Sequence, residues 1–81
     1  MNETTIKTAL DSIVGNMDSF RPFHELQLKI ATAMKKNRKV IFKGTNTLSD
    51  YTSRMAKHLV KPACSNVLAE LKATYREAFP N

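Results

Sequence analysis

Apolar residues recur at helical spacing in four separate stretches of this chain, and this periodicity constrains the fold more than any other feature. The four stripes are Ile6, Leu10, Ile13 and Val14; Phe23, Leu26, Ile30 and Met34; Leu48, Tyr51, Met55 and Leu59; and Cys64, Val67, Leu68, Leu71 and Tyr75. Such spacing places side chains on one face of an α-helix. We therefore predict an all-α fold, a compact bundle of three to four short helices over about residues 5–15, 20–36, 47–60 and 62–79.

Capping and helix-breaking residues mark the ends of these helices. Thr4 or Thr5 can cap the first helix. Residues 47–50, Thr-Leu-Ser-Asp, match the capping box that precedes many helices. On one straight helix the stripes before and after Pro62 would face opposite sides, so we predict that Pro62 opens a separate fourth helix facing the same core.

The segment between the second and third helices has a different composition. Residues 38–44, Arg-Lys-Val-Ile-Phe-Lys-Gly, place three β-favouring residues between charges. We predict a short extended segment near Val40–Phe42, or a tight connector, before the third helix begins.

Length and composition limit the class of protein. A chain of 81 residues holds a single domain, residues 1–81, with one small core. Its longest bulky apolar run, Val40–Phe42, is far too short to span a bilayer, and its N-terminus lacks the pattern of a secretory signal. Cys64 has no second cysteine to pair with, and its place on an apolar stripe favours a buried thiol. We expect a cytoplasmic, reducing location without membrane association.

Positive charge is concentrated in the middle of the chain. The cations between Leu26 and Ala69, called the basic block below, are Lys29, Lys35, Lys36, Arg38, Lys39, Lys43, Arg54, Lys57 and Lys61. Asp50 is the only acid in this stretch, so its net charge is +8. The residues before it carry −2 and those after it carry zero, which gives the chain its net charge of +6. Because such segregation adds self-repulsion, it is typical of a surface that meets an acidic partner, most often nucleic acid.

The third helix adds a polar face to this charge. With its apolar stripe directed inward, Ser49, Ser53 and Lys57 lie on the solvent side. Hydroxyl groups followed by cations suit a helix in the major groove of DNA, as in helix-turn-helix proteins, although the connector is longer than their usual turn. The predicted nucleic-acid-binding residues are Lys35, Lys36, Arg38, Lys39, Lys43, Thr47, Ser49, Ser53, Arg54, Lys57 and Lys61.

Other interpretations of these residues stay open. The outward cations also fit an ordinary solvated helix, on which Asp50 would form an i, i+4 pair with Arg54. The basic block equally suits a protein-interaction module, such as an inhibitor, adaptor or assembly factor of the kind phages and mobile elements use, docking on an acidic face of a larger protein. Our first prediction is a DNA-binding regulatory or accessory protein, and the interaction module is the alternative.

No arrangement of residues points to catalysis, a metal or a cofactor. Cys64, His24 and His58 lack the spacing of a metal site, and neither histidine is placed to activate the thiol. Phe42 and Tyr51 are the only rings on which an unpaired base could stack between cations, and core packing explains both more simply. We predict a non-enzymatic protein without metal or cofactor.

The predicted fourth helix carries more apolar residues, from Val60 to Phe79, than one small core needs. A self-associating face there would give a homodimer that pairs two basic surfaces.

Overall fold

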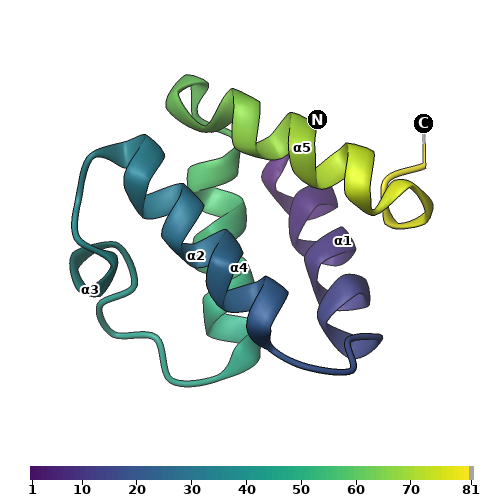
Figure 1. The fold of residues 1–81 in the computed structure, drawn as a ribbon, viewed down its shortest axis with the longest axis horizontal. Helices are drawn as coiled ribbons and strands as arrows, with labels where there is room; N and C mark the ends of the chain where they lie inside the picture. Colours follow the sequence, from purple (N-terminus) through teal and green to yellow (C-terminus); the bar gives the residue numbers. More distant parts are fainter. Residues whose placement is uncertain (81) are drawn as a thin grey trace.

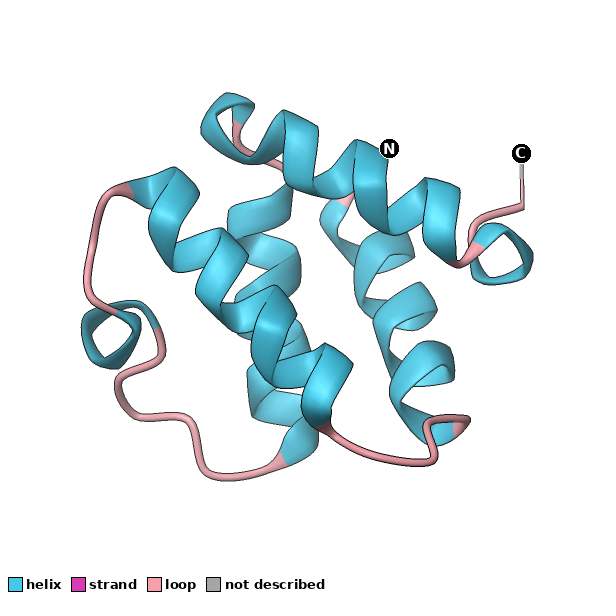
Figure 2. Ribbon diagram, in the orientation of Figure 1, coloured by secondary structure: helices cyan, strands magenta, loops and turns pink. Residues whose placement is uncertain are grey.

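Helices form at all four predicted stretches. The computed structural model describes residues 1–80, and its long helices are α1 (Glu3–Gly15), α2 (Arg21–Met34), α4 (Leu48–Leu59) and α5 (Ser65–Thr74). The short elements are the one-turn helix α3 (Arg38–Ile41) and the 3-10 turns η1 (Pro62–Cys64) and η2 (Arg76–Ala78). No strand occurs in residues 1–80, which confirms the predicted all-α class (Figure 2). None of the helices described has the length and hydropathy that crossing a membrane requires.

The long helices cross one another around a shared centre. In Figure 1, α2 passes in front of α4, while α1 and α4 make the most extensive contact of the bundle. α5 runs across one end, where it contacts α2 and α4, and η2 brings the chain back to α1. The end of α2, α3 and the connector to α4 form the left edge of the molecule in Figure 1. Much of the basic block therefore shares one edge of the fold.

One hydrophobic core joins these elements. The largest fully buried apolar side chains come from α1, α2, α4 and η1, and they are Ile6, Leu10, Ile30, Met55, Leu59 and Cys64. Phe23, Phe42 and Phe79 are buried in the same cluster. The predicted stripes thus face a single core, except that Leu48 at the first position of α4 is 46% exposed. The buried position predicted for Cys64 is confirmed.

The extended segment predicted near Val40–Phe42 is wrong, because these residues belong to α3 and its C-terminal end. Asn37 caps this turn, its Oδ1 accepting a hydrogen bond from the Lys39 amide at 2.8 Å. Ile41 and Phe42 are both buried, whereas Val40 is 61% exposed. Neighbouring residues of a strand point to opposite faces, so an extended chain would not bury both Ile41 and Phe42 on this core. Packing has overridden the β-propensity of the three residues.

Two helix ends also differ from the prediction. α1 begins at Glu3 because Asn2, and not Thr4 or Thr5, is its cap: Asn2 Oδ1 accepts from the Thr5 amide at 2.8 Å. α2 ends at Met34 rather than residue 36, because Lys35 adopts a left-handed backbone with φ of 56°. The Lys35 amide then donates back into the last turn, to the Thr32 carbonyl, which closes the helix end.

The predicted fourth helix is divided into three pieces. The break before Pro62 is confirmed, since Lys61 has the extended backbone that a following proline favours. Beyond η1, α5 is regular up to Thr74, but Tyr75 leaves the helical conformation. The turn η2 follows, and Phe79 after it is buried in the core. A straight helix over residues 62–79 is therefore wrong.

Candidate nucleic-acid interface

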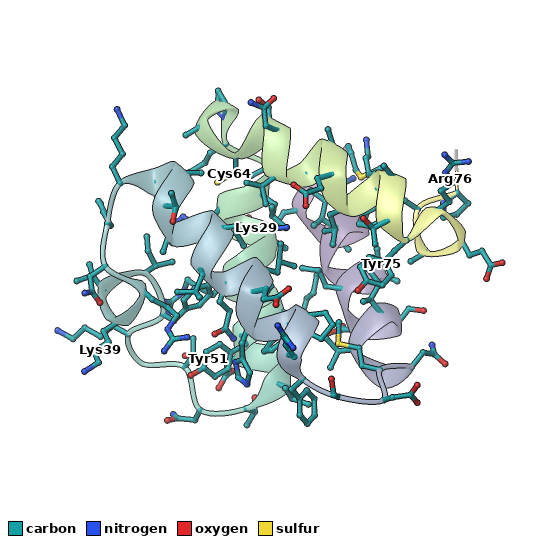
Figure 3. The ribbon with its side chains drawn as sticks, viewed as in Figure 1. Lys29, Lys39, Tyr51, Cys64, Tyr75 and Arg76 are labelled. Atoms are coloured by element: carbon teal, nitrogen blue, oxygen red, sulfur yellow. The ribbon has the colours of Figure 1, made fainter. Side chains whose placement is uncertain are left out.

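The basic block is distributed over the edge formed by α2, α3 and the connector, and over α4. Lys35 and Lys36 follow α2, Lys39 lies on α3 and Lys43 on the connector, and all four are exposed. Figure 3 labels Lys39 at this edge, with Arg76 at the opposite end of the longest axis. On α4 and just after it, Lys57 is exposed, whereas Arg54 and Lys61 are half-buried.

Most of these cations have no acidic partner. Within residues 1–80 the ion pairs are Lys7 with Asp11, Arg21 with Glu25 and Lys29 with Glu70. Lys29 is the only member of the basic block among them, and its hydrogen bond to the Glu70 carboxylate raises the pKa of its ammonium group. The other eight cations of the block form no ion pair within residues 1–80.

The N-terminus of α4 carries the predicted capping box. Thr47 Oγ1 accepts from the Asp50 amide at 3.1 Å, while Asp50 Oδ2 accepts from the Asn46 and Thr47 amides, each at 3.2 Å. These hydrogen bonds, that from Asn46 first, lower the pKa of the Asp50 carboxyl. The capping box is confirmed. It also affects which backbone amides at this helix end are free to bind an anion. The Asn46 and Thr47 amides, which would suit a phosphate, already donate to a carboxylate of the chain itself.

Arg54 has a structural task that the sequence did not reveal. Its Nη1 donates to the carbonyls of Ile41 and Lys43, each at 2.9 Å. The guanidinium thereby satisfies acceptors at the end of α3, and it forms no ion pair with Asp50 within residues 1–80. The i, i+4 pair expected for these two residues is therefore wrong, and Arg54 holds the connector against α4.

The outer face of α4 is recessed. Ser53 and Lys57 line an open hollow of about 270 Å³ together with Gly44 and Thr45 of the connector, and the carboxylates of Glu3 and Asp50 border the same space. One turn earlier on α4, the hydroxyl of Ser49 lies 3.3 Å from Lys7 Nζ, which donates to it from α1. Ser49, Ser53 and Lys57, the residues predicted to face the major groove, thus lie beside acidic residues or beside α1 rather than on a free basic face.

A second concentration of charge surrounds His58, near the C-terminal end of α4. Its Nδ1 lies 3.2 Å from Lys61 Nζ. Burial lowers the pKa of His58, and the charges of Lys61, Lys57 and Arg54 lower it further. Lys36 acts in the same direction from the end of α2. Lysines from two elements therefore form one positive region here.

Other reactive residues form no assembled site. Residues 1–80 hold no group of three His, Cys, Asp or Glu side chains that could bind a metal ion. Burial raises the pKa of the Cys64 thiol.

Comparisons of the chain with protein-family models, with curated proteins and with solved structures find no match.

Proposed function

We propose that this protein binds nucleic acid, with double-stranded DNA as the first candidate, and acts as a non-enzymatic regulatory or accessory protein. The observation that carries the proposal is the unpaired charge: apart from Lys29, no cation of the basic block forms an ion pair within residues 1–80. Lysines and arginines that contact phosphates release counterions, and this release is the main source of sequence-independent affinity for DNA. A folded chain that leaves this much charge uncompensated is well suited to such a partner.

Two observations favour contacts with the phosphate backbone over contacts with base edges. Lys36, Lys39 and Lys43 are exposed in and on either side of α3 and carry flexible ammonium groups, which bind phosphates as point charges. On α4, by contrast, Arg54 is occupied by carbonyls and the hydroxyls of Thr47 and Ser49 have partners inside the fold. Binding should therefore depend weakly on sequence.

One observation favours the alternative, docking on an acidic protein surface. Val40 is 61% exposed and stands between the cations of α3 and Lys43. An apolar side chain among lysines adds nothing to a phosphate contact, whereas interfaces between proteins combine both kinds of group. This alternative predicts a stoichiometric protein partner.

The test is the salt dependence of DNA binding, measured by fluorescence anisotropy on unrelated duplexes. For the wild type, log affinity should fall linearly with log salt, and different duplexes should bind alike. Lys36→Ala combined with Lys43→Ala should weaken binding to all of them. The slope should become shallower by about 0.9 for each phosphate that the protein no longer neutralises.

The matched control is Lys72→Ala with Arg76→Ala, which removes the same charge elsewhere. Arg76 lies at the far end of the molecule (Figure 3), and Lys72 borders the same surface hollow as Arg76. It should leave the slope unchanged. If both double variants act alike, or if the wild type binds no duplex even in low salt, DNA binding is wrong. The same lysine variants should then mainly slow association with an acidic protein.

A further inference from the structure

An open pocket lies between α2, α3 and α4, on the edge that carries the basic block. It has a volume of about 310 Å³ and is lined by His24, Gln27, Arg38, Lys39, Phe42 and Tyr51. Figure 3 labels two of these residues, Tyr51 near the lower end of α2 and Lys39 at the outer edge of α3. A pocket of this volume is at the lower limit of small-ligand sites and suits one planar group of a larger molecule.

Gln27 is the most informative residue of the lining. It is only 4% exposed, yet its amide forms no hydrogen bond with any other residue from 1 to 80. Within the same residues, no fully enclosed side-chain nitrogen or oxygen lacks a partner, so the Gln27 amide keeps a small solvent contact, and Gln27 is one of the residues that line the pocket. Buried amides are nearly always paired inside the protein. This amide instead offers a donor and an acceptor to a ligand, from a position that packing already holds.

Two aromatic residues, Phe42 and Tyr51, line the same pocket. The ring centroids of Phe42 and Tyr51 are 5.7 Å apart, and Phe23 packs against Tyr51 in a T-shaped arrangement at a centroid distance of 6.1 Å. Phe42 is buried, while Tyr51 is half-buried and keeps part of its surface open. A ring fixed by two neighbours and open on one side is a platform on which a planar base can stack.

Positive charge borders the same pocket. Arg38 and Lys39 are exposed members of the lining, and neither forms an ion pair within residues 1–80. Their head groups can bind a phosphate at the mouth while a base occupies the space beside Tyr51. Amide, ring and cations thus match the three parts of a nucleotide that proteins recognise.

We propose that this pocket binds one unpaired nucleotide, with the base against Tyr51, an edge of the base on the Gln27 amide and the phosphate on Arg38 and Lys39. The nucleotide belongs either to a nucleic acid, in which case the inference rests on the proposed function, or to the free pool. Adenine is the first base to test, because glutamine pairs with two groups on one adenine edge. A phosphotyrosine side chain fits less well, since its ring would bring only C–H groups to the Gln27 amide.

The first experiment compares a perfect duplex with the same duplex carrying one unpaired adenosine, by fluorescence anisotropy. The wild type should prefer the second by about tenfold, the scale of one stacked and hydrogen-bonded base. Gln27→Leu, which keeps the volume and removes the amide, should lose this preference and bind the perfect duplex as before. Leu28→Ala, at the neighbouring exposed position of α2, is the control and should change neither affinity.

The second experiment titrates adenosine monophosphate and follows the Gln27 side-chain amide signal by NMR. A saturable shift that weakens in Arg38→Ala with Lys39→Ala would support the pocket independently of any DNA binding. Those two cations are exposed, so this variant keeps the core intact even if Gln27→Leu folds poorly.

The two proposals fail in distinguishable ways. If the wild type binds both duplexes equally and the Gln27 signal does not respond to the nucleotide, the pocket inference is wrong while DNA binding stands. If it binds neither duplex but the Gln27 signal shifts with adenosine monophosphate, DNA binding is wrong and the pocket takes a free nucleotide. A shift with phosphotyrosine and none with the nucleotide would overturn the inference in favour of a phosphopeptide.

Discussion

α4 is held on one side by α1 and on the other by the connector, and the two contacts use polar groups differently. Against α1, the buried Thr52 hydroxyl donates to Asp11 Oδ1 at 2.6 Å, and Lys7 Nζ donates to Asp11 Oδ2 at 2.8 Å, so hydroxyl, carboxylate and ammonium satisfy one another. Against the connector, Arg54 binds only backbone carbonyls. The lysines beside it stay unpaired. Charge is thus neutralised where helices pack and left free at the edge, so different side chains should control stability and binding.

The largest expected effect comes from the core beneath both contacts. Met55 is fully buried on α4, so Met55→Ala should lower the free energy of unfolding by about 2–5 kcal/mol, because it removes buried apolar surface and leaves a cavity. Val40→Ala, at the exposed edge, should change it by less than about 0.5 kcal/mol. Urea unfolding followed by circular dichroism measures both. Equal losses of unfolding free energy in the two variants would mean that Val40 stabilises the fold as much as Met55 does, which would contradict the contrast between core and edge.

The hydrogen bond between Thr52 and Asp11 should have a smaller effect. Thr52→Val keeps the shape and removes the hydroxyl, so we expect a loss of about 1–2 kcal/mol, because a buried bond to a carboxylate disappears. Thr74→Val is the control, since its exposed hydroxyl bonds only the Glu70 carbonyl of its own helix. Affinity for DNA should be unchanged in both variants. A loss of binding in folded Thr52→Val protein would connect the two regions.

Arg54→Lys should lower stability less than the two buried changes, by about 1 kcal/mol, because lysine keeps the charge but lacks the planar guanidinium whose Nη1 donates to two carbonyls. Native-state hydrogen exchange should become faster at the Thr45 amide, whose acceptor is the Phe42 carbonyl at the end of α3. The salt slope of DNA binding should stay the same. A changed slope with unchanged exchange would make Arg54 a DNA contact and not a brace for the connector.

Local signals predicted much of the fold. Periodicity located the four helical stretches, the capping pattern at residues 47–50 located the start of α4, and the phase change around Pro62 located the break before η1. Each of these signals depends on neighbours within one or two turns of helix. Where such signals agreed with the packing, the prediction held.

The errors have tertiary causes. Nothing within a few residues of Val40 says that Ile41 and Phe42 share one core, or that Arg54 turns towards carbonyls eleven and thirteen residues earlier. Lys7 also contacts α4 through Thr52, a residue 45 positions later in the chain. Gln27 did leave a signal: it follows Phe23 by one helical turn, so a lone amide stands on an apolar stripe. A polar side chain at a buried position normally has a hydrogen-bond partner.

Lys35 is both a cation of the basic block and a residue with an unfavourable backbone conformation. It is the only non-glycine residue from 1 to 80 with a positive φ, at a helix end where glycine would avoid a strain of about 1–2 kcal/mol. A protein with a core this small can spare little stability. On the proposed function, a long cation at this position is a compromise between stability and affinity for nucleic acid. On the same proposal, Lys35→Gly should give a more stable protein that binds nucleic acid less tightly.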